Sequence, residues 1–331
     1  MKINERSSVW IAVVNVFAAS KKAASMWEKA EIMLKDQNVR FRSRKTGRAG
    51  NAMELTFDAC VSGYRKFIAV GGDGTVHDVL NGIASFIEWK EDSGDKVLFS
   101  DFTISVLPLG SGNDWIKSSG IPNNIEKAIG LIASESYARQ DVVRVSVLDP
   151  IDPECKRQLA VSYMMNVGGI GIDARVCERV NAAKARGKRG KKLYVSALLH
   201  AIRNRVPAFA RVVCDGECVF DGAYLSMAFG VGKYSGGGMR QTPAAVLDDG
   251  LLDMTIIPDL PLMRIAREVP RLFTGSFLKV PELIVSKSRT IKVYPYGASV
   301  HEPVEVDGEV VGRAPVCFEV LDSQINIVCG S

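Results

Sequence analysis

The sequence predicts an α/β domain built on a parallel sheet, followed by a mainly antiparallel β-sandwich domain. In the first part of the chain, short apolar runs alternate with segments of helical periodicity, the pattern of parallel strands joined by helices. After about residue 140, strand-like runs separated by turn residues predominate. The chain has 331 residues, 47% of them hydrophobic and 24% charged, which is enough for two cores.

The predicted first domain spans residues 1–140. Strands are expected where apolar residues cluster in short runs, at residues 9–14, 39–42, 67–70 and 102–107. Helices are expected where apolar residues recur at helical spacing, at residues 25–34, 49–62, 76–83 and 125–132. This alternation implies a parallel sheet covered on both faces.

The predicted second domain spans residues 141–317. Its strand-like runs are expected at residues 143–147, 163–167, 210–214, 219–229, 252–257 and 291–294. Two helical insertions are expected, at residues 176–203 and 262–274. The C-terminal segment, residues 318–331, contains a last strand signal at 325–329, which is expected to return to the first domain.

Composition limits the class of function. A net charge of +5 is small for this length and does not indicate a nucleic-acid partner. Seven scattered cysteines without a CxxC pair indicate neither a disulfide framework nor a zinc site, and they fit a reducing cytosol. The three histidines are too dispersed for a transition-metal cluster, whereas a magnesium site made of oxygens stays open.

No membrane-spanning helix is predicted. Residues 7–20 carry no charge and imitate a short signal peptide, but Asn15 interrupts the apolar run and the α/β domain needs its first strand here. The longest other uncharged run, residues 158–172, is too short and too rich in glycine to span a bilayer. A cytoplasmic location is therefore expected.

The most informative motif is VGGDGTVHDVLNG at residues 70–82, which follows a predicted strand and opens a predicted helix. Ligands bind at this end of parallel strands, where glycines let backbone amides approach phosphate oxygens and Thr75 adds a hydroxyl. Asp73 beside such a cradle indicates magnesium contact or general-base chemistry. The structural alternative is that Asp73 only caps the helix.

A second turn of the same construction is PLGSGND at residues 108–114. Ser111, Gly112 and Asn113 offer small donor groups directly after the strand predicted at 102–107. One glycine turn is weak support for a phosphate site, whereas two on neighbouring strand ends of one sheet are much stronger.

These two motifs closely resemble those of the lipid-kinase family of diacylglycerol and sphingosine kinases and their bacterial relatives. Four later motifs follow in the family's order: NVGGIGIDA at 166–174, SGGGM at 235–239, LDDGLLD at 247–253 and EVDGE at 305–309. GGDGT alone is shared with NAD kinases, but the later motifs favour the lipid branch. The resemblance implies an NAD kinase/diacylglycerol kinase-like fold, with a nucleotide-binding first domain and a lipid-substrate second domain.

The resemblance further implies ATP and Mg²⁺ as cofactors. The residues implied to contact nucleotide match the family's turns: Asn15, Thr46, Gly71, Gly72, Asp73, Gly74, Thr75, Asp78, Ser111, Gly112 and Asn113. Asn15 matches the first residue of the family's Asn-Pro-x-Ser-Gly turn. Val16 and Ala19 replace the proline and the glycine of that turn, so a looser grip on phosphate is expected there.

In the second domain, the resemblance implies a structural magnesium network at Asp249 and the carbonyl of Leu251. Glu309 resembles the proposed proton acceptor of bacterial diacylglycerol kinases, whereas sphingosine kinases assign that role to the residue matching Asp73. The sequence leaves this division open. Tight turns are the structural alternative for both Asp-Gly pairs, at residues 249–250 and 307–308.

Two further aspartates, Asp114 and Asp173, are candidates for the acceptor pocket, although Asp173 fits a helix cap equally well. The expected activity is ATP-dependent phosphorylation of a lipid hydroxyl, first of diacylglycerol. The alternatives are a sphingoid-base or ceramide kinase, then an NAD kinase, or a protein that binds lipid or nucleotide without turnover.

The expected partners are ATP and a lipid substrate at the membrane surface, without nucleic acid, and a homodimer is compatible with the sequence. Six of the nine residues at 184–192 are basic. Such a run suits an anionic membrane surface, and a solvated face of the protein is its structural alternative. The protein is therefore expected to associate peripherally with the membrane.

Overall fold

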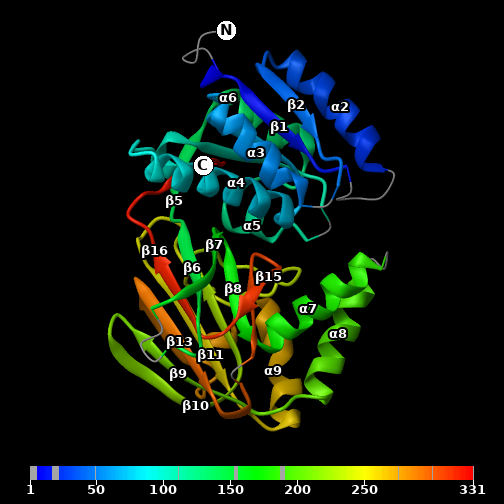
Figure 1. Ribbon diagram of the computed structural model, residues 1–331. Coiled ribbons are helices and arrows are strands. Elements are labelled where there is room, and N and C mark those ends of the chain that lie inside the picture. The colour runs from blue at the N-terminus through cyan, green and yellow to red at the C-terminus, as the bar shows by residue number, and fades with distance from the viewer. Residues whose placement is uncertain are drawn as a thin grey trace. The chain divides into compact units, whose positions relative to one another are not determined.

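The computed structural model describes residues 6–16, 22–48, 50–110, 112–152, 156–186, 191–274, 276–299 and 301–330 (Figure 1). The chain forms two compact units. Unit 1 comprises Met1–Val142 and Asp322–Ser331, and unit 2 comprises Val143–Leu321. None of the helices in the described part of the chain combines the length and the apolar composition needed to span a bilayer.

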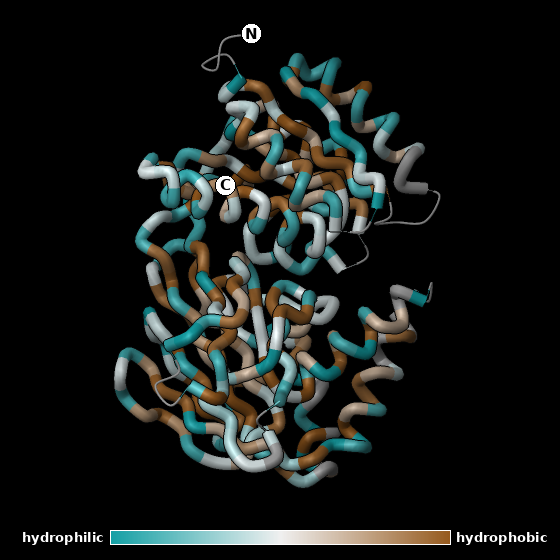
Figure 2. The backbone as a smooth tube through the Cα atoms, viewed as in Figure 1, coloured by the Kyte–Doolittle hydropathy of each residue, from teal (hydrophilic) through white to brown (hydrophobic). Residues whose placement is uncertain are grey.

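Unit 1 contains the predicted parallel sheet. Its strands are β1 (Trp10–Val14), β2 (Phe41–Lys45), β3 (Lys66–Gly71), β4 (Thr103–Pro108), β5 (Tyr137–Gln140) and β17 (Ile325–Val328). Their order is β2-β1-β3-β4-β17-β5, and only β5 runs antiparallel to its neighbour. The apolar run WIAVV of β1 is buried along its whole length because it lies inside this sheet. Figure 2 shows such hydrophobic stretches along the central strands.

The helices of unit 1 are α2 (Lys22–Asp36), α3 (Asn51–Val61), α4 (Asp73–Asp92), α5 (Asp114–Ser118) and α6 (Ile125–Ser134). Helix α3 packs against α4, and α2 packs against α6. The apolar stripe expected on α4 is buried, with Val79, Leu80 and Ile83 fully inaccessible to solvent. The 3₁₀ helix Phe99–Asp101 precedes β4.

Unit 2 is mainly antiparallel, as predicted. Its strands are β6 (Val143–Leu148), β7 (Gln158–Met164), β8 (Val167–Gly171), β9 (Ala208–Cys214), β10 (Glu217–Gly230), β11 (Leu252–Pro258), β12 (Ile284–Ser288), β13 (Thr290–Tyr296), β14 (Pro303–Val306), β15 (Glu309–Arg313) and β16 (Val316–Val320). Among the described residues they form one continuous sheet, β15-β14-β8-β10-β9-β13-β16-β6-β7, with β11 and β12 added beside β10. This sheet encloses a large apolar core that includes Phe229, Met254 and Phe318.

The helices of unit 2 are α7 (Ile172–Ala185), α8 (Lys191–Arg203) and α9 (Leu262–Thr274), with 3₁₀ helices at Ser276–Lys279 and Gly297–Ser299. Two expectations need correction. Residues 163–167 were expected to form one strand, but the chain turns at Met165 and Asn166 between β7 and β8. The single helical insertion expected at 176–203 is two helices, and the second domain also contains β12, β14, β15 and β16, which were not expected.

Candidate active site

The switch point of the parallel sheet lies between β1 and β3. The chain leaves β1 for β2 on one side and leaves β3 for β4 on the other, and ligands bind at the carboxyl ends of strands at such a point. Asn15 follows β1 there, and its Nδ2 donates a hydrogen bond to Thr75 Oγ1 (3.1 Å) in the first turn of α4. The Asn15 backbone N–H also donates to the Val70 carbonyl (3.0 Å). The topology therefore brings Asn15 and the GGDGT motif together.

The N-terminus of α4 is built for close approach of a ligand. Gly72 is the N-cap residue and supplies no side-chain cap, and its carbonyl accepts hydrogen bonds from the backbone N–H groups of Thr75 (2.9 Å) and Val76 (3.2 Å). The positive end of the helix dipole lies at this turn. Gly74 and Asp78 lie in the first turns of the helix and are partly accessible. This geometry suits an anion such as a phosphate.

Gly71 is required by the contact between β3 and α4. A Cβ atom at Gly71 would lie 2.2 Å from Thr75 Oγ1 and 2.8 Å from Thr75 Cβ. Because both groups are buried, we expect Gly71→Ala to lower the melting temperature and to raise the KM for ATP. Gly130→Ala is the control, since a Cβ there meets nothing within 4 Å. A Gly71→Ala protein that melts and binds ATP like the control would contradict this packing.

The second glycine turn lies directly against the first. The backbone N–H groups of Leu109 and Gly110 both donate to the Gly71 carbonyl, at 2.8 and 3.1 Å. A Cβ at Gly110 would lie 2.5 Å from the Gly72 Cα atom, so the two turns meet backbone to backbone. The two motifs therefore form one structure, here called the paired glycine turns (residues 71–75 and 109–113).

Asp73 joins the paired glycine turns to α5. Its Oδ2 accepts a hydrogen bond from the Asp114 backbone N–H and its Oδ1 accepts one from the Trp115 backbone N–H, both at 3.1 Å. Asp73 thus caps a neighbouring helix instead of α4, the helix that it opens. Gly112 lies close by, since a Cβ atom at this position would be 3.1 Å from Asp73 Oδ2. Each carboxylate oxygen of Asp73 thus accepts a backbone hydrogen bond from the start of α5.

Two other predicted nucleotide contacts are described, Asn113 in the second turn and Thr46 after β2. Asn113 adopts a left-handed conformation (φ 51°), and its Nδ2 donates to the Gly110 carbonyl (2.9 Å) and to Asn123 Oδ1 (3.0 Å). Thr46 follows β2, and its backbone N–H donates to the Val14 carbonyl (2.9 Å). Among the described residues, the buried Thr46 Oγ1 and Asn113 Oδ1 have no hydrogen-bond partner. Ser111 and Ala19 lie outside the described residues.

Asp114, predicted as an acceptor-site residue, is buried at the start of α5. Its Oδ1 accepts a hydrogen bond from Lys117 Nζ at 2.5 Å. Its side chain therefore forms an ion pair within α5, next to the backbone amide that Asp73 binds.

In unit 2, the EVDGE motif forms the hairpin between β14 and β15. Asp307 and Gly308 have φ angles of 51° and 87°, which suit a two-residue hairpin turn. The Asp307 carboxylate also accepts hydrogen bonds from the backbone N–H groups of Met165 (3.2 Å) and Asn166 (3.0 Å). The tight turn expected as the structural alternative is therefore present, and it is anchored to the β7–β8 connection.

Glu309 begins β15 and is exposed. Its Oε2 accepts one hydrogen bond from Asn181 Nδ2 (3.2 Å), and the same amide donates to the Gly308 carbonyl (3.1 Å). Cys177 Sγ also donates to that carbonyl (2.9 Å). The motif therefore presents an accessible carboxylate on a hairpin that several contacts hold in place.

The side chains that contact this hairpin, Cys177 and Asn181, come from helix α7. Asp173, Cys177 and Asn181 recur at intervals of four, so they lie on the same side of the helix. Asp173 accepts a hydrogen bond from Ser226 Oγ and does not cap the helix, which begins at Ile172. Burial raises the pKa of Asp173, although hydrogen bonds from Ser226 and Gln241 oppose the shift. The contacts of Cys177 and Asn181 with the hairpin were not predicted from the sequence. Their spacing of four and eight residues from Asp173 is the one sequence signal that could have indicated them.

Glu305 is a buried carboxyl group that sequence reasoning also missed. Its Oε2 accepts a hydrogen bond from the Gly308 backbone N–H (2.9 Å). Burial raises the pKa of Glu305 well above its ordinary value and outweighs this hydrogen bond, and the nearby carboxylates of Asp173, Asp307 and Glu309 raise the pKa further. Glu305 therefore favours its neutral form beneath the turn that carries Glu309.

This raised pKa predicts a pH-dependent stability. The folded state binds the proton of Glu305 more tightly than the unfolded state, so the contribution is full below the unfolded pKa, about 4.3, and is lost as the pH rises towards the folded pKa. We expect Glu305→Gln to raise the melting temperature at pH 7.5, by about 2–4 °C for each kcal/mol recovered. At about pH 4 the variant and the wild type should melt together, because both side chains are then neutral.

The matched control for this pH effect is Glu319→Gln, which alters an exposed glutamate on β16. It should leave the melting temperature unchanged at both pH values. A Glu305→Gln protein less stable than the wild type at pH 7.5 would show that Glu305 is needed in its charged form.

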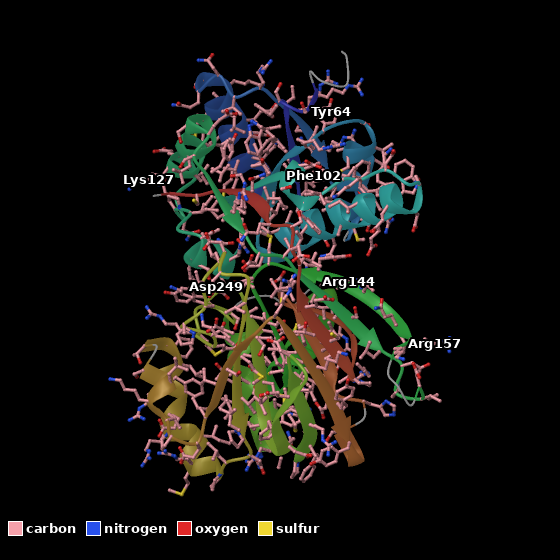
Figure 3. All side chains as sticks on the ribbon, turned by 90° about the vertical axis from the view of Figure 1, so that its left-hand side faces the viewer. Tyr64, Phe102, Lys127, Arg144, Arg157 and Asp249 are labelled. Atoms are coloured by element: carbon pink, nitrogen blue, oxygen red, sulfur yellow. The ribbon has the colours of Figure 1, made fainter. Side chains whose placement is uncertain are left out.

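The residues implied to hold a structural magnesium ion have other partners. Asp249 precedes β11 and is labelled in Figure 3; its Oδ1 accepts a hydrogen bond from the Leu251 backbone N–H (3.1 Å). Its Oδ2 pairs with Lys287 Nζ, also at 3.1 Å. No group of three or more Asp, Glu, His or Cys side chains suited to a metal ion is found among the residues that the structure describes. With the ammonium group of Lys287 already against it, the Asp249 carboxylate does not fit a structural Mg²⁺ ion.

Two family models together match most of the chain. The diacylglycerol kinase catalytic domain matches residues 9–145. The YegS C-terminal NAD kinase beta sandwich-like domain matches residues 166–329. The first range covers most of unit 1 and the second covers most of unit 2, although residues 322–329 of the second range belong to unit 1.

Individual relatives agree with both models. A protein of Enterobacter sp. (strain 638) named "Probable lipid kinase YegS-like" is 29% identical over 300 residues, which cover 88% of this chain and 87% of that protein. A diacylglycerol kinase of Staphylococcus carnosus (strain TM300) is 24% identical over 299 residues, covering 90% of this chain and 88% of that protein.

The fold is shared as well. The crystal structure of a diacylglycerol kinase from Bacillus anthracis str. Sterne superimposes with a TM-score of 0.69 at 19% identity, covering 98% of this chain and 97% of that one. Since the two family models together match most of the chain, and both relatives are matched over nearly nine-tenths of their length, this chain belongs to the diacylglycerol kinase and YegS-like family and is a lipid kinase.

Proposed function

We propose that this protein transfers the γ-phosphate of ATP to a hydroxyl group of a lipid, with diacylglycerol as the first candidate acceptor. The observation that carries the proposal is the pair of glycine turns at the switch point of a parallel sheet, which meet backbone to backbone and are joined by Asp73. This arrangement offers backbone amides to phosphate oxygens without intervening side chains. The names of the relatives support a lipid acceptor.

In the proposed reaction, the lipid oxygen forms a bond to the γ-phosphorus, and the bond from that phosphorus to the bridging oxygen of ADP breaks. The acceptor hydroxyl gives its proton to Glu309. When bound with ATP, Mg²⁺ would neutralise phosphate charge. The N-terminus of α4 and the hydroxyl of Thr75 would hold the nucleotide phosphates, and Asn15 would orient Thr75 through its hydrogen bond.

Contact geometry favours Glu309 over Asp73 as the proton acceptor. Both oxygens of Asp73 accept backbone hydrogen bonds, whereas Glu309 is exposed and accepts one from Asn181. A general base must lie within hydrogen-bond reach of the proton that it removes, and the exposed carboxylate of Glu309 is open to an acceptor hydroxyl, whereas that of Asp73 is fixed against α5. We therefore assign proton transfer to Glu309 and assign the alignment of the glycine turns to Asp73.

A panel of acceptors tests the substrate class. The purified protein is incubated with radiolabelled ATP and, separately, with diacylglycerol, a sphingoid base, ceramide, undecaprenol and NAD. We expect labelled phosphatidic acid from diacylglycerol. Phosphorylation of another of these lipids would change the acceptor but keep the reaction, whereas phosphorylation of NAD alone would contradict the proposal. Binding of ATP and lipid without any labelled product would indicate a binding protein instead.

We also propose that the protein works at a membrane surface, because its acceptor resides in a bilayer. The basic run at residues 184–192 stays a candidate for this contact, but residues 187–190 and the side chains of Lys184, Lys191 and Lys192 lie outside the described part of the structure.

A further inference from the structure

Lys287 lies in unit 2 beside the LDDG motif and has no role in the proposed reaction. It belongs to β12, which pairs antiparallel with β11, and in this register Lys287 lies directly opposite Asp253. Asp253 is almost completely buried, with 3% of its side chain exposed, whereas 34% of the Lys287 side chain is exposed. The sheet therefore holds a lysine at the edge of a buried carboxylate.

Three oxygen atoms from one stretch of the chain, residues 244–253, surround the ammonium group. Lys287 Nζ lies 3.1 Å from Asp249 Oδ2, 3.1 Å from Asp253 Oδ2 and 3.2 Å from the Ala244 carbonyl oxygen. Asp249 and Ala244 belong to the segment between β10 and β11, and Asp253 belongs to β11 itself. The Lys287 ammonium group on β12 thus links the connection between β10 and β11 to β11 and β12.

The negative charges of Asp249 and Asp253 require a positive charge between them. Asp249 and Asp253 both direct an oxygen at the same point, and two carboxylates so placed repel each other unless a positive charge lies between them. Among the described residues, Asp253 Oδ2 accepts no hydrogen bond of good geometry, so the ion pair with Lys287 is the interaction that compensates its burial.

We propose that the ammonium group of Lys287 takes the place of a structural metal ion at the LDDG motif, so that unit 2 folds without a divalent cation. A Mg²⁺ ion needs about six oxygen ligands at about 2.0–2.1 Å, and an ammonium group in contact with the same carboxylates opposes its entry. Lysine supplies one positive charge and three N–H donors, which match the three oxygens present.

The wild-type protein provides the first test, and no nucleotide or lipid is used, so the result is independent of the kinase activity. The full-length protein is melted in EDTA and in increasing MgCl₂ or CaCl₂. We expect the same melting temperature throughout. A rise in melting temperature with Mg²⁺ that Asp249→Asn abolishes would overturn the proposal.

The second test removes the ammonium group. Lys287→Met keeps the apolar stem but leaves the carboxylates unpaired, so we expect the melting temperature to fall by about 4 °C or more in EDTA. Added Mg²⁺ should then restore part of the loss, and the double variant Lys287→Met with Asp249→Asn should lose this response. Lys292→Met, at an exposed lysine on β13, is the matched control and should melt like the wild type.

The possible outcomes distinguish a lysine that takes the place of a metal ion from a lysine in an ordinary surface ion pair. Metal-dependent stability in Lys287→Met but not in the wild type supports the proposal. A Lys287→Met protein that melts normally in EDTA shows that the lysine is dispensable and overturns it. If Lys287→Met does not fold, the wild-type titration still decides, and Lys287→Arg should keep metal-independent melting because it retains the charge.

Discussion

Replacement of Glu309 by Gln is expected to lower kcat by about 10²–10⁴-fold, the usual contribution of a positioned general base. Gln keeps the shape of the side chain, and its amide oxygen can still accept the hydrogen bond from Asn181 Nδ2. It cannot accept the proton of the acceptor hydroxyl. The KM for ATP should change little, because the nucleotide is assigned to the paired glycine turns. Initial rates with detergent-dispersed diacylglycerol, at several ATP concentrations, measure both constants.

The control for this variant is Glu217→Gln, at an exposed glutamate that begins β10. It should leave both constants unchanged. If Glu309→Gln keeps most of its kcat while Asp73→Asn is inactive at saturating ATP, proton transfer belongs to Asp73 and the assignment made here is wrong.

Replacement of Asp73 by Asn is expected to act on binding and stability together. The carboxylate accepts hydrogen bonds from two backbone N–H groups, of Asp114 and Trp115, and an amide side chain can accept at only one oxygen. An unsatisfied backbone donor costs about 1–3 kcal/mol, so we expect a lower melting temperature and at least an about tenfold fall in kcat/KM.

Differential scanning fluorimetry with and without ATP, together with steady-state kinetics, checks this prediction. Asp92→Asn is the matched control, because it changes an exposed carboxylate at the other end of the same helix. An Asp73→Asn protein that melts normally and keeps its KM for ATP, with a loss confined to kcat, would favour a direct chemical role for Asp73.

The sequence predicted the features that depend on local order. Gly71 to Thr75 could be placed at the end of a strand because the apolar run before them and the helical periodicity after them are both short-range patterns. The strand at 325–329 returns to the first sheet as expected, where β17 pairs with β4 and β5.

The remaining features depend on contacts between distant segments. The partners of Asp73 are backbone amides 41 and 42 positions away, and no side-chain pattern marks them. Lys287 meets Asp253 only through the register of β11 and β12, and the sequence does not fix that register. The break between β7 and β8 was missed because apolar residues continue through Met165, whose amide is held by Asp307.

The most direct test of the proposed kinase reaction follows the phosphoryl group itself. The protein is incubated with diacylglycerol and ATP that carries ¹⁸O on the non-bridging oxygens of its γ-phosphate, and the products are analysed by mass spectrometry. We expect phosphatidic acid that retains all of these labelled oxygens, because the lipid hydroxyl supplies the remaining one, together with one ADP for each lipid phosphorylated. If the label appears only in inorganic phosphate, with the lipid unchanged, the protein hydrolyses ATP and does not phosphorylate diacylglycerol.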